Sequence, residues 1–247
     1  MQNILYYILV KMSNKPTVII CVPGRTFSNR FFISWSECLI KLFYKYNVNV
    51  SNEYSSQVNF ARSKCLGAHV LKGPDQKPFQ GELDYDVLLW LDSDMVFNYE
   101  LIDGLIQSCL HTHPVVSGVY SIDGGQHLSC VKDWNNEYFA KHGHFEFLTE
   151  ETARELLAEE TEWLKCAYSG MGCMAIRKGV IENERFKYPW FFSDVKQIYT
   201  GNQSMPYITE GMSEDVCFVR KLIDNGIIDG VMVNLKLRFG HEKSIVY

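Results

Sequence analysis

Tyr85-Asp86-Val87-Leu88-Leu89-Trp90-Leu91-Asp92-Ser93-Asp94 is an almost unbroken apolar run that ends in two carboxylates around one serine. Its apolar part, residues 87–91, is typical of a strand buried on both faces, as in the middle of a largely parallel sheet. The aspartates follow where that strand leaves the sheet, and open α/β sheets bind ligands at the carboxyl ends of their strands. The run therefore predicts an α/β fold with a ligand site at Asp92 and Asp94.

The Asp-Ser-Asp triplet has a metal interpretation and a structural one. Mg²⁺ and Mn²⁺ take oxygen ligands, often one or two carboxylates together with substrate phosphates, and no Lys or Arg adjoins this pair. The alternative is a turn that ends the strand, with the aspartates capping backbone N–H groups. The apolar run in front of the triplet favours the metal interpretation.

The composition excludes several classes of protein. A chain of 247 residues with 47% hydrophobic residues can bury a real core in one large or two small domains. A net charge of -5 without a basic block argues against a nucleic-acid-binding surface. The 8 cysteines are scattered and form no C-x-x-C pair, which predicts buried free thiols in a reducing compartment and not a zinc site.

The N-terminus carries a short apolar run, residues 4–10. It is much shorter than the ~20 residues that span a bilayer, and it lacks the cleavage pattern of a signal peptide. Residues 1–16 are interpreted as an N-terminal extension with the useful start at Met12, the alternative being a weak interfacial anchor. We expect a soluble, cytoplasmic protein without stable membrane insertion.

Strands and helices alternate along the first half of the chain, which is the mark of βαβ units. The segment 121–166 interrupts this alternation and is expected to be an insertion beside the site, and residues 186–212 are expected to be an aromatic loop. The predicted strands are residues 17–22, 47–50, 87–91, 114–119, 173–177 and 227–237. The predicted helices are residues 29–46, 58–70, a segment capped by Asn98, 150–160, and a segment capped by Ser213 that ends before Gly226.

Four motifs occur in order, and each follows a strand or begins a helix. They are Pro23-Gly24-Arg25, the Asp-Ser-Asp triplet, Ser213-Glu214-Asp215 and Gly240-His241. In this order the sequence resembles the GT-A glycosyltransferases, nucleotide-diphospho-sugar-dependent enzymes with a Rossmann-like sheet. It looks most like the compact soluble enzymes of large DNA viruses and phages. The residues alone argue only for a metal-dependent nucleotide or phosphate-ester enzyme.

The resemblance covers residues 17–243 and implies an α/β fold with a mixed, mostly parallel central sheet flanked by helices. It implies one domain over residues 17–247. Residues 17–120 would form the nucleotide-binding half, and residues 121–247 the acceptor and catalytic half.

The resemblance also implies a metal site. Asp94 would coordinate the ion directly, and Asp92 would bind the metal, or the ribose and a metal-bound water. His241 would supply a third ligand, and an imidazole suits Mn²⁺ better than Mg²⁺; the alternative is a surface histidine near the end of the chain. The ion would bridge the two donor phosphates and stabilise the departing diphosphate.

Glu214 and Asp215 match the acidic pair on the acceptor side of inverting relatives. There a carboxylate removes the proton of the acceptor hydroxyl as its oxygen attacks the anomeric carbon. Asp215 is the first candidate for this base and Glu214 the second. The alternative role is stabilisation of a helix N-terminus by acidic residues after a Ser cap, and both roles can hold at once.

A further set of residues is expected to contact the donor. By the resemblance, Pro23, Gly24 and Arg25 line the base and ribose pocket, with Arg25 near the diphosphate. The remaining candidates are Arg62, Ser93, Gly118, Tyr120 and Gly170, with Asp123 as a further contact to the donor sugar. The alternatives are a plain turn at Pro-Gly, a solvated helix charge at Arg62 and tight strand packing at the glycines.

Aromatic residues gather in the irregular segments, where sugar C–H faces could stack on them. They are Trp134, Tyr138, Trp190, Phe191 and Tyr199, and for most of them core burial is the favoured alternative. His142 and His144 are interpreted as loop residues and not as a second metal site.

Together these features predict a metal-dependent glycosyltransferase of the hexosyltransferase type, with Mn²⁺ or Mg²⁺ as cofactor. It would move a sugar from a UDP-sugar to a hydroxyl of a carbohydrate or glycoprotein glycan, inverting by single displacement. The alternatives are a retaining enzyme of the same fold, a nucleotidyltransferase or sugar-nucleotide hydrolase, and a non-enzymatic carbohydrate-binding module. No nucleic-acid partner is expected, and the chain can be part of a longer multidomain protein. The donor sugar, acceptor, linkage and oligomeric state do not follow from the sequence.

Overall fold

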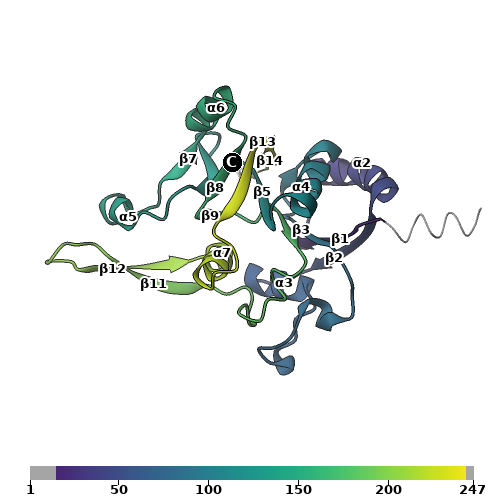
Figure 1. Ribbon diagram of the computed structural model, residues 1–247, viewed down its shortest axis with the longest axis horizontal. Coiled ribbons are helices and arrows are strands. Elements are labelled where there is room, and N and C mark those ends of the chain that lie inside the picture. Colours follow the sequence, from purple (N-terminus) through teal and green to yellow (C-terminus); the bar gives the residue numbers. More distant parts are fainter. Residues whose placement is uncertain (1–14, 243–247) are drawn as a thin grey trace, which may run out of the picture.

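The computed structural model describes residues 15–242. The predicted start at Met12 and most of the predicted N-terminal extension lie outside this range. A central sheet with helices on both faces dominates the structure (Figure 1). Its strands in spatial order are β2 (Asn47–Glu53), β1 (Thr17–Pro23), β3 (Val87–Leu91), β10 (Cys173–Arg177), β5 (Val115–Val119), β13 (Val231–Arg238) and β8 (Trp163–Cys166).

Most strands of this sheet run in one direction. The strands β2, β1 and β3 pair in parallel, as do β5 and β13, whereas β10 is antiparallel to both of its neighbours and β8 is antiparallel to β13. The predicted mixed, mostly parallel α/β sheet is therefore confirmed. The carboxyl ends of β1, β3, β5 and β13 lie at one edge, where ligands of such sheets bind.

The side chains of the central strands alternate between two cores. Val18 and Ile20 of β1 pack with α2 (Asn29–Lys45) and α4 (Tyr99–His111) on one face of the sheet. Ile19 and Cys21 pack on the opposite face, in the cluster that contains residues of α7 (Glu214–Asp224) and the end of α3 (Val58–Cys65). Since every residue of β3 is buried, the apolar run 87–91 has the central position that its sequence predicted.

Polar side chains fix the start of two predicted helices. Ser28 Oγ accepts a hydrogen bond from the Phe31 N–H at 3.0 Å at the start of α2. Asn98 Oδ1 accepts one from the Leu101 N–H, also at 3.0 Å, so the predicted Asn98 cap of α4 is confirmed. The helix predicted over residues 58–70 is shorter, because α3 ends at Cys65 and Gly67 follows with a left-handed φ of 67°. Two 3₁₀ turns, Val70–Lys72 and Pro78–Gly81, complete this connection.

Apart from β8, which belongs to the central sheet, residues 121–169 form a side lobe next to that sheet, at the upper left of Figure 1. Its three strands are β7 (Phe147–Thr149), β6 (His127–Val131) and β9 (Tyr168–Ser169), in that order. Two helices accompany them, α5 (Asn136–His142) and α6 (Glu150–Ala158). The expectation of an insertion that begins at residue 121 agrees with this arrangement.

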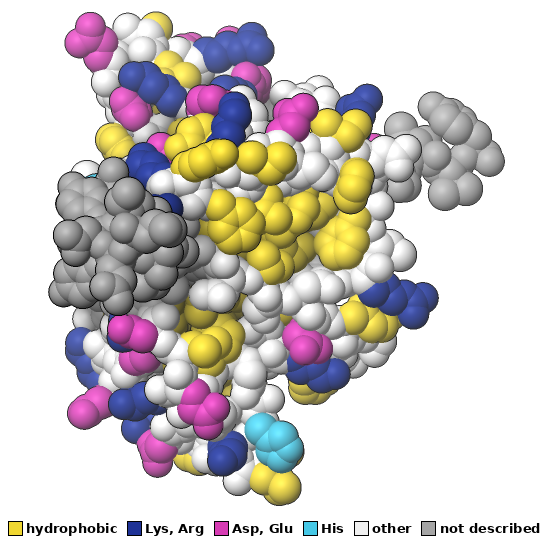
Figure 2. All heavy atoms as spheres, turned by 90° about the vertical axis from the view of Figure 1, so that its right-hand side faces the viewer, with side chains coloured by type: hydrophobic (Ala, Val, Ile, Leu, Met, Phe, Trp, Pro, Cys, Tyr) yellow, Lys and Arg dark blue, Asp and Glu magenta, His cyan; other side chains and the backbone are white. Residues whose placement is uncertain are grey.

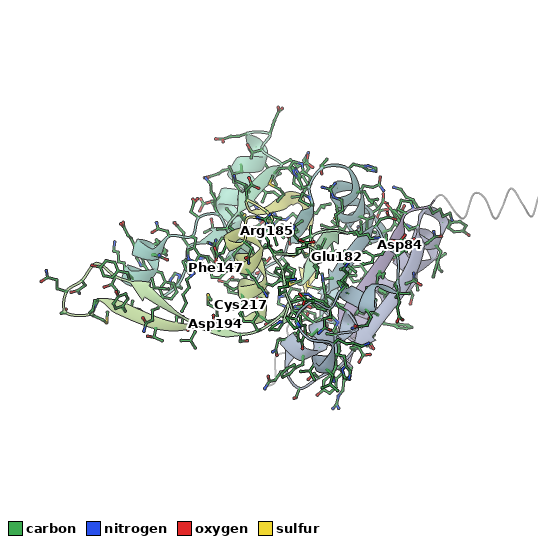
Figure 3. All side chains as sticks on the ribbon, turned by 60° about the horizontal axis from the view of Figure 1, so that its bottom comes forward. Asp84, Phe147, Glu182, Arg185, Asp194 and Cys217 are labelled. Atoms are coloured by element: carbon green, nitrogen blue, oxygen red, sulfur yellow. The ribbon has the colours of Figure 1, made fainter. Side chains whose placement is uncertain are left out.

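The expectation of a loop over residues 186–212 is wrong. This segment contains a β-hairpin of β11 (Asp194–Tyr199) and β12 (Tyr207–Met212), which extends to the left in Figure 1. Most of its residues are exposed on both faces, so the sequence lacks the apolar alternation that marks a half-buried strand. Figure 3 labels Asp194 at the start of the hairpin and Cys217 on α7, where the hairpin meets that helix.

The outer face of α2 carries a contiguous set of exposed apolar side chains (Figure 2). They are Phe32, Ile33, Ile40, Phe43 and Tyr44. All 8 cysteines are buried and free, as predicted. Within residues 15–242, no helix has the length and apolar character needed to cross a membrane.

Candidate active site

The ends of β1 and β3 meet at the carboxyl edge of the sheet. A Cβ added at Gly24, just after β1, would lie 2.9 Å from Ser93 Oγ, and the φ of Gly24 is 141°. Only glycine adopts this conformation readily, and only glycine allows so close an approach. The predicted nucleotide-binding residues Gly24 and Ser93 are thus direct neighbours. Arg25 is exposed, with its guanidinium 4.9 Å from the ring centroid of Tyr54.

A short two-stranded sheet connects the C-terminal part of the chain with the Asp-Ser-Asp triplet. β14 (Gly240–His241) pairs antiparallel with β4 (Met95–Val96), and His241 lies opposite Met95. The Glu242 N–H donates a hydrogen bond to the Asp94 carbonyl oxygen at 2.8 Å. This pairing holds the backbone of His241 beside Asp94, which only the resemblance had predicted.

The His241 ring is oriented by the backbone on one side and faces Asp94 on the other. Its Nδ1 lies 2.9 Å from the Ser121 carbonyl oxygen, which can only accept, so Nδ1 carries a proton. Its Nε2 lies 3.2 Å from Asp94 Oδ2. With a neutral ring, a nitrogen lone pair and a carboxylate oxygen face each other, and a cation or a proton between them is needed to satisfy both. A metal-binding histidine commonly has this arrangement of its second nitrogen.

Arg62 links the predicted metal side of the site with the predicted catalytic side. Its Nη2 lies 3.0 Å from Asp92 Oδ1 and donates to Asp92 Oδ2 at 3.1 Å. Its Nε donates to Glu214 Oε1 at 3.1 Å. The Arg62 side chain is only 3% exposed, so the charge is taken out of water and depends on these two carboxylates.

The electrostatics around Arg62 follow from burial and from this bridge. Burial lowers the pKa of Arg62, but the carboxylates of Asp92 and Glu214 outweigh it, and the pKa is raised overall. Burial also raises the pKa of Glu214, although Arg62 opposes this shift. Arg62 therefore stays charged, and Glu214 is an ion-pair partner of it and less suited than Asp215 to act as a free base.

Asp215 is held at the start of α7 by three donors. Tyr168 O–H donates to Asp215 Oδ2 at 2.9 Å, and the Val216 N–H donates to Oδ1 at 2.8 Å. Ser213 Oγ also hydrogen-bonds to Oδ1. Ser213 thus occupies the predicted N-cap position, but its side chain makes no capping bond to the helix backbone and orients Asp215 instead. Burial, and then the charge of Asp215, raise the pKa of Tyr168, so that it remains a hydrogen-bond donor.

Tyr168 is the residue of this cluster that the sequence reasoning missed. No local sequence pattern connects it with Asp215, which lies 47 positions later. The link between Arg62 and Glu214, 152 positions apart, was missed for the same reason.

Three residues predicted to contact the donor, Gly118, Tyr120 and Gly170, lie in closely packed surroundings within the protein, as the alternative interpretation of the glycines holds. A Cβ at Gly118 would lie 2.6 Å from the Phe239 ring, and a Cβ at Gly170 would lie 2.2 Å from Tyr120 Oη. Tyr120 is buried, and its hydroxyl accepts a hydrogen bond from the Gly172 N–H at 3.2 Å. Contact of these residues with a donor stays a prediction. Their observed contacts hold the Tyr120 ring in place. This ring packs against the His241 ring, with 5.2 Å between the ring centroids.

The predicted aromatic floor divides in the structure. Trp190 and Phe191 are core residues, 0% and 2% exposed, which agrees with the predicted alternative of core burial. Tyr199 lies on the exposed hairpin, and Trp134 lies half-buried under Arg220. Tyr138 is half-buried on α5, between the rings of His142 and His144.

The predicted metal ligands are brought together only in part. Among residues 15–242, no three His, Cys, Asp or Glu side chains are grouped closely enough to form a metal site. Asp94 and His241 form a pair that fits a divalent cation, because Nε2 and Oδ2 face each other and Asp94 is 48% exposed to incoming ligands. Asp92 is turned to Arg62, so water and ligand oxygens would have to supply much of the coordination, as is common for Mg²⁺.

The comparisons with known proteins found likenesses in structure alone. No protein-family model and no curated sequence matches the chain. The structure of A197 from STIV shares 14% identity at a TM-score of 0.48, covering 94% of this chain and 96% of that one. Glucosyl-3-phosphoglycerate synthase from Mycobacterium tuberculosis, in complex with Mg²⁺ and UDP, shares 13% identity at a TM-score of 0.46, covering 97% and 76%.

A third likeness is to a glycosyltransferase that takes part in glycosylation of the major capsid of PBCV-1. It shares 12% identity at a TM-score of 0.36, covering 93% of this chain and 95% of that one. These structures include the class of enzyme that the sequence motifs resemble. All three TM-scores are below 0.5, so these likenesses carry no argument about function.

Proposed function

We propose that the protein is a metal-dependent glycosyltransferase that uses a UDP-sugar and inverts the anomeric centre by single displacement. The observation that carries this proposal is the pair formed by Asp94 Oδ2 and His241 Nε2, 3.2 Å apart beyond the end of a fully buried central strand. With a neutral His241 ring, these two acceptors face each other, and a bound cation would satisfy both. Nδ1 of His241 lies at a backbone oxygen, which leaves Nε2 as the atom that would face a metal ion.

Asp94 and His241 would hold Mn²⁺ or Mg²⁺, and the imidazole favours Mn²⁺. When bound, the ion supplies positive charge to the donor diphosphate and so stabilises the leaving group. Gly24 and Ser93 would line the nucleotide pocket, since Gly24 lets the backbone approach closely. Arg62 would keep Asp92 ionised and in place beside them.

Asp215 would act as the general base. In the transfer, the acceptor oxygen forms a bond to the anomeric carbon while the bond from that carbon to the diphosphate oxygen breaks. The electron pair of the broken bond stays on the diphosphate, and the hydroxyl proton passes to Asp215. The hydrogen bond from Tyr168 to Oδ2 orients this carboxylate, and Glu214 is committed to Arg62.

The test is a thermal-shift panel on the full chain, with UDP, UDP-sugars and nucleoside triphosphates, each with and without Mn²⁺. A ligand that binds only the folded state raises the melting temperature. Stabilisation by uridine diphosphates only with metal supports the proposal, and Asp94→Asn should remove it. Stabilisation by nucleoside triphosphates instead would indicate a nucleotidyltransferase. Release of free sugar without an acceptor would indicate a hydrolase.

The stereochemical part of the proposal has its own test. NMR of the product from an α-linked UDP-sugar should show a β-glycoside, and an α-glycoside would indicate a retaining enzyme. A carbohydrate-binding module would bind sugars without any effect of Asp94→Asn.

A further inference from the structure

The side lobe contains a cavity of about 570 Å³ that no step of the proposed transfer uses. This volume lies in the usual range for small-molecule sites, ~300–1,000 Å³. Its walls come from β6, the segment around β7 and the first turn of α6, so it lies outside the central sheet (Figure 1). Figure 3 labels Phe147 of β7, one of its lining residues.

The cavity begins next to the residue that orients His241. The Ser121 carbonyl oxygen accepts from His241 Nδ1, and the next two residues, Ile122 and Asp123, already line the cavity. The Ile122 N–H donates to the His127 carbonyl oxygen at 3.0 Å, which fixes this wall to β6. One wall of the cavity therefore follows directly in the chain from the residue that orients His241.

The lining is rich in carboxylates and poor in cations. Asp123, Asp133 and Glu146 line the cavity, and Lys132 is the one Lys or Arg among its lining residues. Asp123 is engaged by the His127 ring, but Asp133 and Glu146 form no ion pair within residues 15–242. An anionic group would meet net negative charge here, whereas a hydroxyl could donate a hydrogen bond to either free carboxylate.

Aromatic and imidazole groups stand among these carboxylates. Tyr138 and Phe147 line the cavity and are half-buried, so part of each ring can meet a ligand. The Asp123 carboxylate engages Nδ1 of His127, which orients that ring. A carbohydrate has hydroxyls around its edge, which can donate hydrogen bonds to carboxylates, and C–H groups on its faces, which can pack on aromatic rings. The carboxylates and rings of this cavity are therefore complementary to a carbohydrate.

We infer that this cavity binds a neutral carbohydrate, as a part of the acceptor. The inference rests on the proposed glycosyltransferase function. It gives the predicted carbohydrate acceptor a binding site and narrows it to a neutral glycan, as opposed to a phosphorylated or carboxylated molecule. The carboxylates Asp133 and Glu146 recognise hydroxyls, and Tyr138 and Phe147 contact a ring face.

The experiment uses the full chain and a panel of methyl glycosides of common hexoses and N-acetylhexosamines, each beside the matching sugar phosphate. Binding is followed by saturation-transfer NMR and titration. Asp133→Asn/Glu146→Gln removes both charges with little change in shape, and Glu146→Gln alone guards against misfolding because this side chain is exposed. Glu159→Gln is the matched control, an exposed carboxylate of the same lobe outside the cavity lining.

A neutral glycoside should bind, and the double variant should raise its Kd by about tenfold or more, as expected for lost hydrogen bonds to charged groups. Glu159→Gln should leave the Kd unchanged. The inference is overturned if no neutral glycoside binds, if a sugar phosphate binds better than its glycoside, or if the double variant binds as the wild type does.

The same variants separate this inference from the proposed function. Metal-dependent UDP binding should be unchanged in the double variant, because Asp133 and Glu146 are not part of the predicted donor site. If the wild-type chain does not bind UDP, the proposed function is contradicted. If the double variant binds UDP normally and also binds the glycoside as tightly as the wild type does, only the acceptor site is contradicted.

Discussion

His241 Nε2 lies 3.2 Å from Asp94 Oδ2, although the two residues are 147 positions apart in the chain. Backbone pairing of β14 with β4 produces this approach, and the Ser121 carbonyl oxygen orients the ring. The pair is therefore built by elements that are fixed independently of any ligand. This prior arrangement is what a metal site needs to bind without reorganisation.

His241→Ala should weaken Mn²⁺ binding by at least about tenfold. Loss of a residue that only orients a metal-binding histidine already lowers metal affinity by ~10–100-fold, and this variant removes the proposed ligand itself. It should weaken Mg²⁺ binding less, since Mg²⁺ prefers oxygen ligands. Titration of both metals in the presence of UDP measures the two affinities. His111→Ala, an exposed histidine at the end of α4, is the control, and an equal effect of both variants would argue against ligation by His241.

Arg62→Met should destabilise the fold by about 3 kcal/mol, because it leaves Asp92 and Glu214 without their shared cation. Chemical denaturation measures the loss. Adding Glu214→Gln to Arg62→Met should restore part of the stability, since one of the two uncompensated carboxylates becomes neutral. Arg154→Ala, on the exposed face of α6, should cost less than about 1 kcal/mol. A double variant less stable than Arg62→Met would contradict the bridging role of Arg62.

Gly24→Ala should be more destabilising than Gly125→Ala by about 1 kcal/mol or more. Both glycines have positive φ angles, 141° and 115°, but only Gly24 has a neighbour in the way, Ser93 Oγ at 2.9 Å. The comparison therefore isolates the close approach of β1 to the Asp-Ser-Asp triplet. Thermal unfolding gives the stabilities, and UDP titration should show weaker binding in Gly24→Ala alone. Equal behaviour of both variants would exclude a tight contact at Gly24.

Asp215→Asn should lower kcat by ~10²–10⁴-fold while UDP binding stays intact, as expected for loss of a general base. Tyr168→Phe should lower kcat by a smaller factor without changing the KM for the donor, because it removes one hydrogen bond that orients Asp215. Tyr199→Phe, on the exposed hairpin, should have no effect. If Glu214→Gln reduced kcat more than Asp215→Asn, the base would have to be reassigned to Glu214.

The sequence predicted those parts of the fold that local pattern determines. The buried run 87–91 and the helix α2 follow from hydrophobic pattern, and the start of α4 follows from the capping side chain of Asn98. The antiparallel insertion of β10 between β3 and β5 is set by long-range pairing, which no local pattern encodes. The hairpin of β11 and β12 was missed because its strands have almost no buried side.

The candidate site divides along the same line. Asp92 and Asp94 were predicted because they follow a buried strand. Glu214 and Asp215 were predicted because they match the acidic pair of the family that the sequence resembles. Their partners Arg62, Ser121 and Tyr168 come from other elements, and only the fold brings them into contact. Arg62 was proposed as a nucleotide contact by resemblance, whereas its observed contacts are with two carboxylates of the site itself.

The most direct test of the metal-dependent donor site is calorimetric titration of UDP into the full chain, with Mn²⁺ and with a chelator, for the wild type and Asp94→Asn. The structure leads us to expect binding by the wild type only with Mn²⁺ and none by the variant. UDP binding of equal strength with the chelator, or in Asp94→Asn, would contradict a cation held between Asp94 and His241.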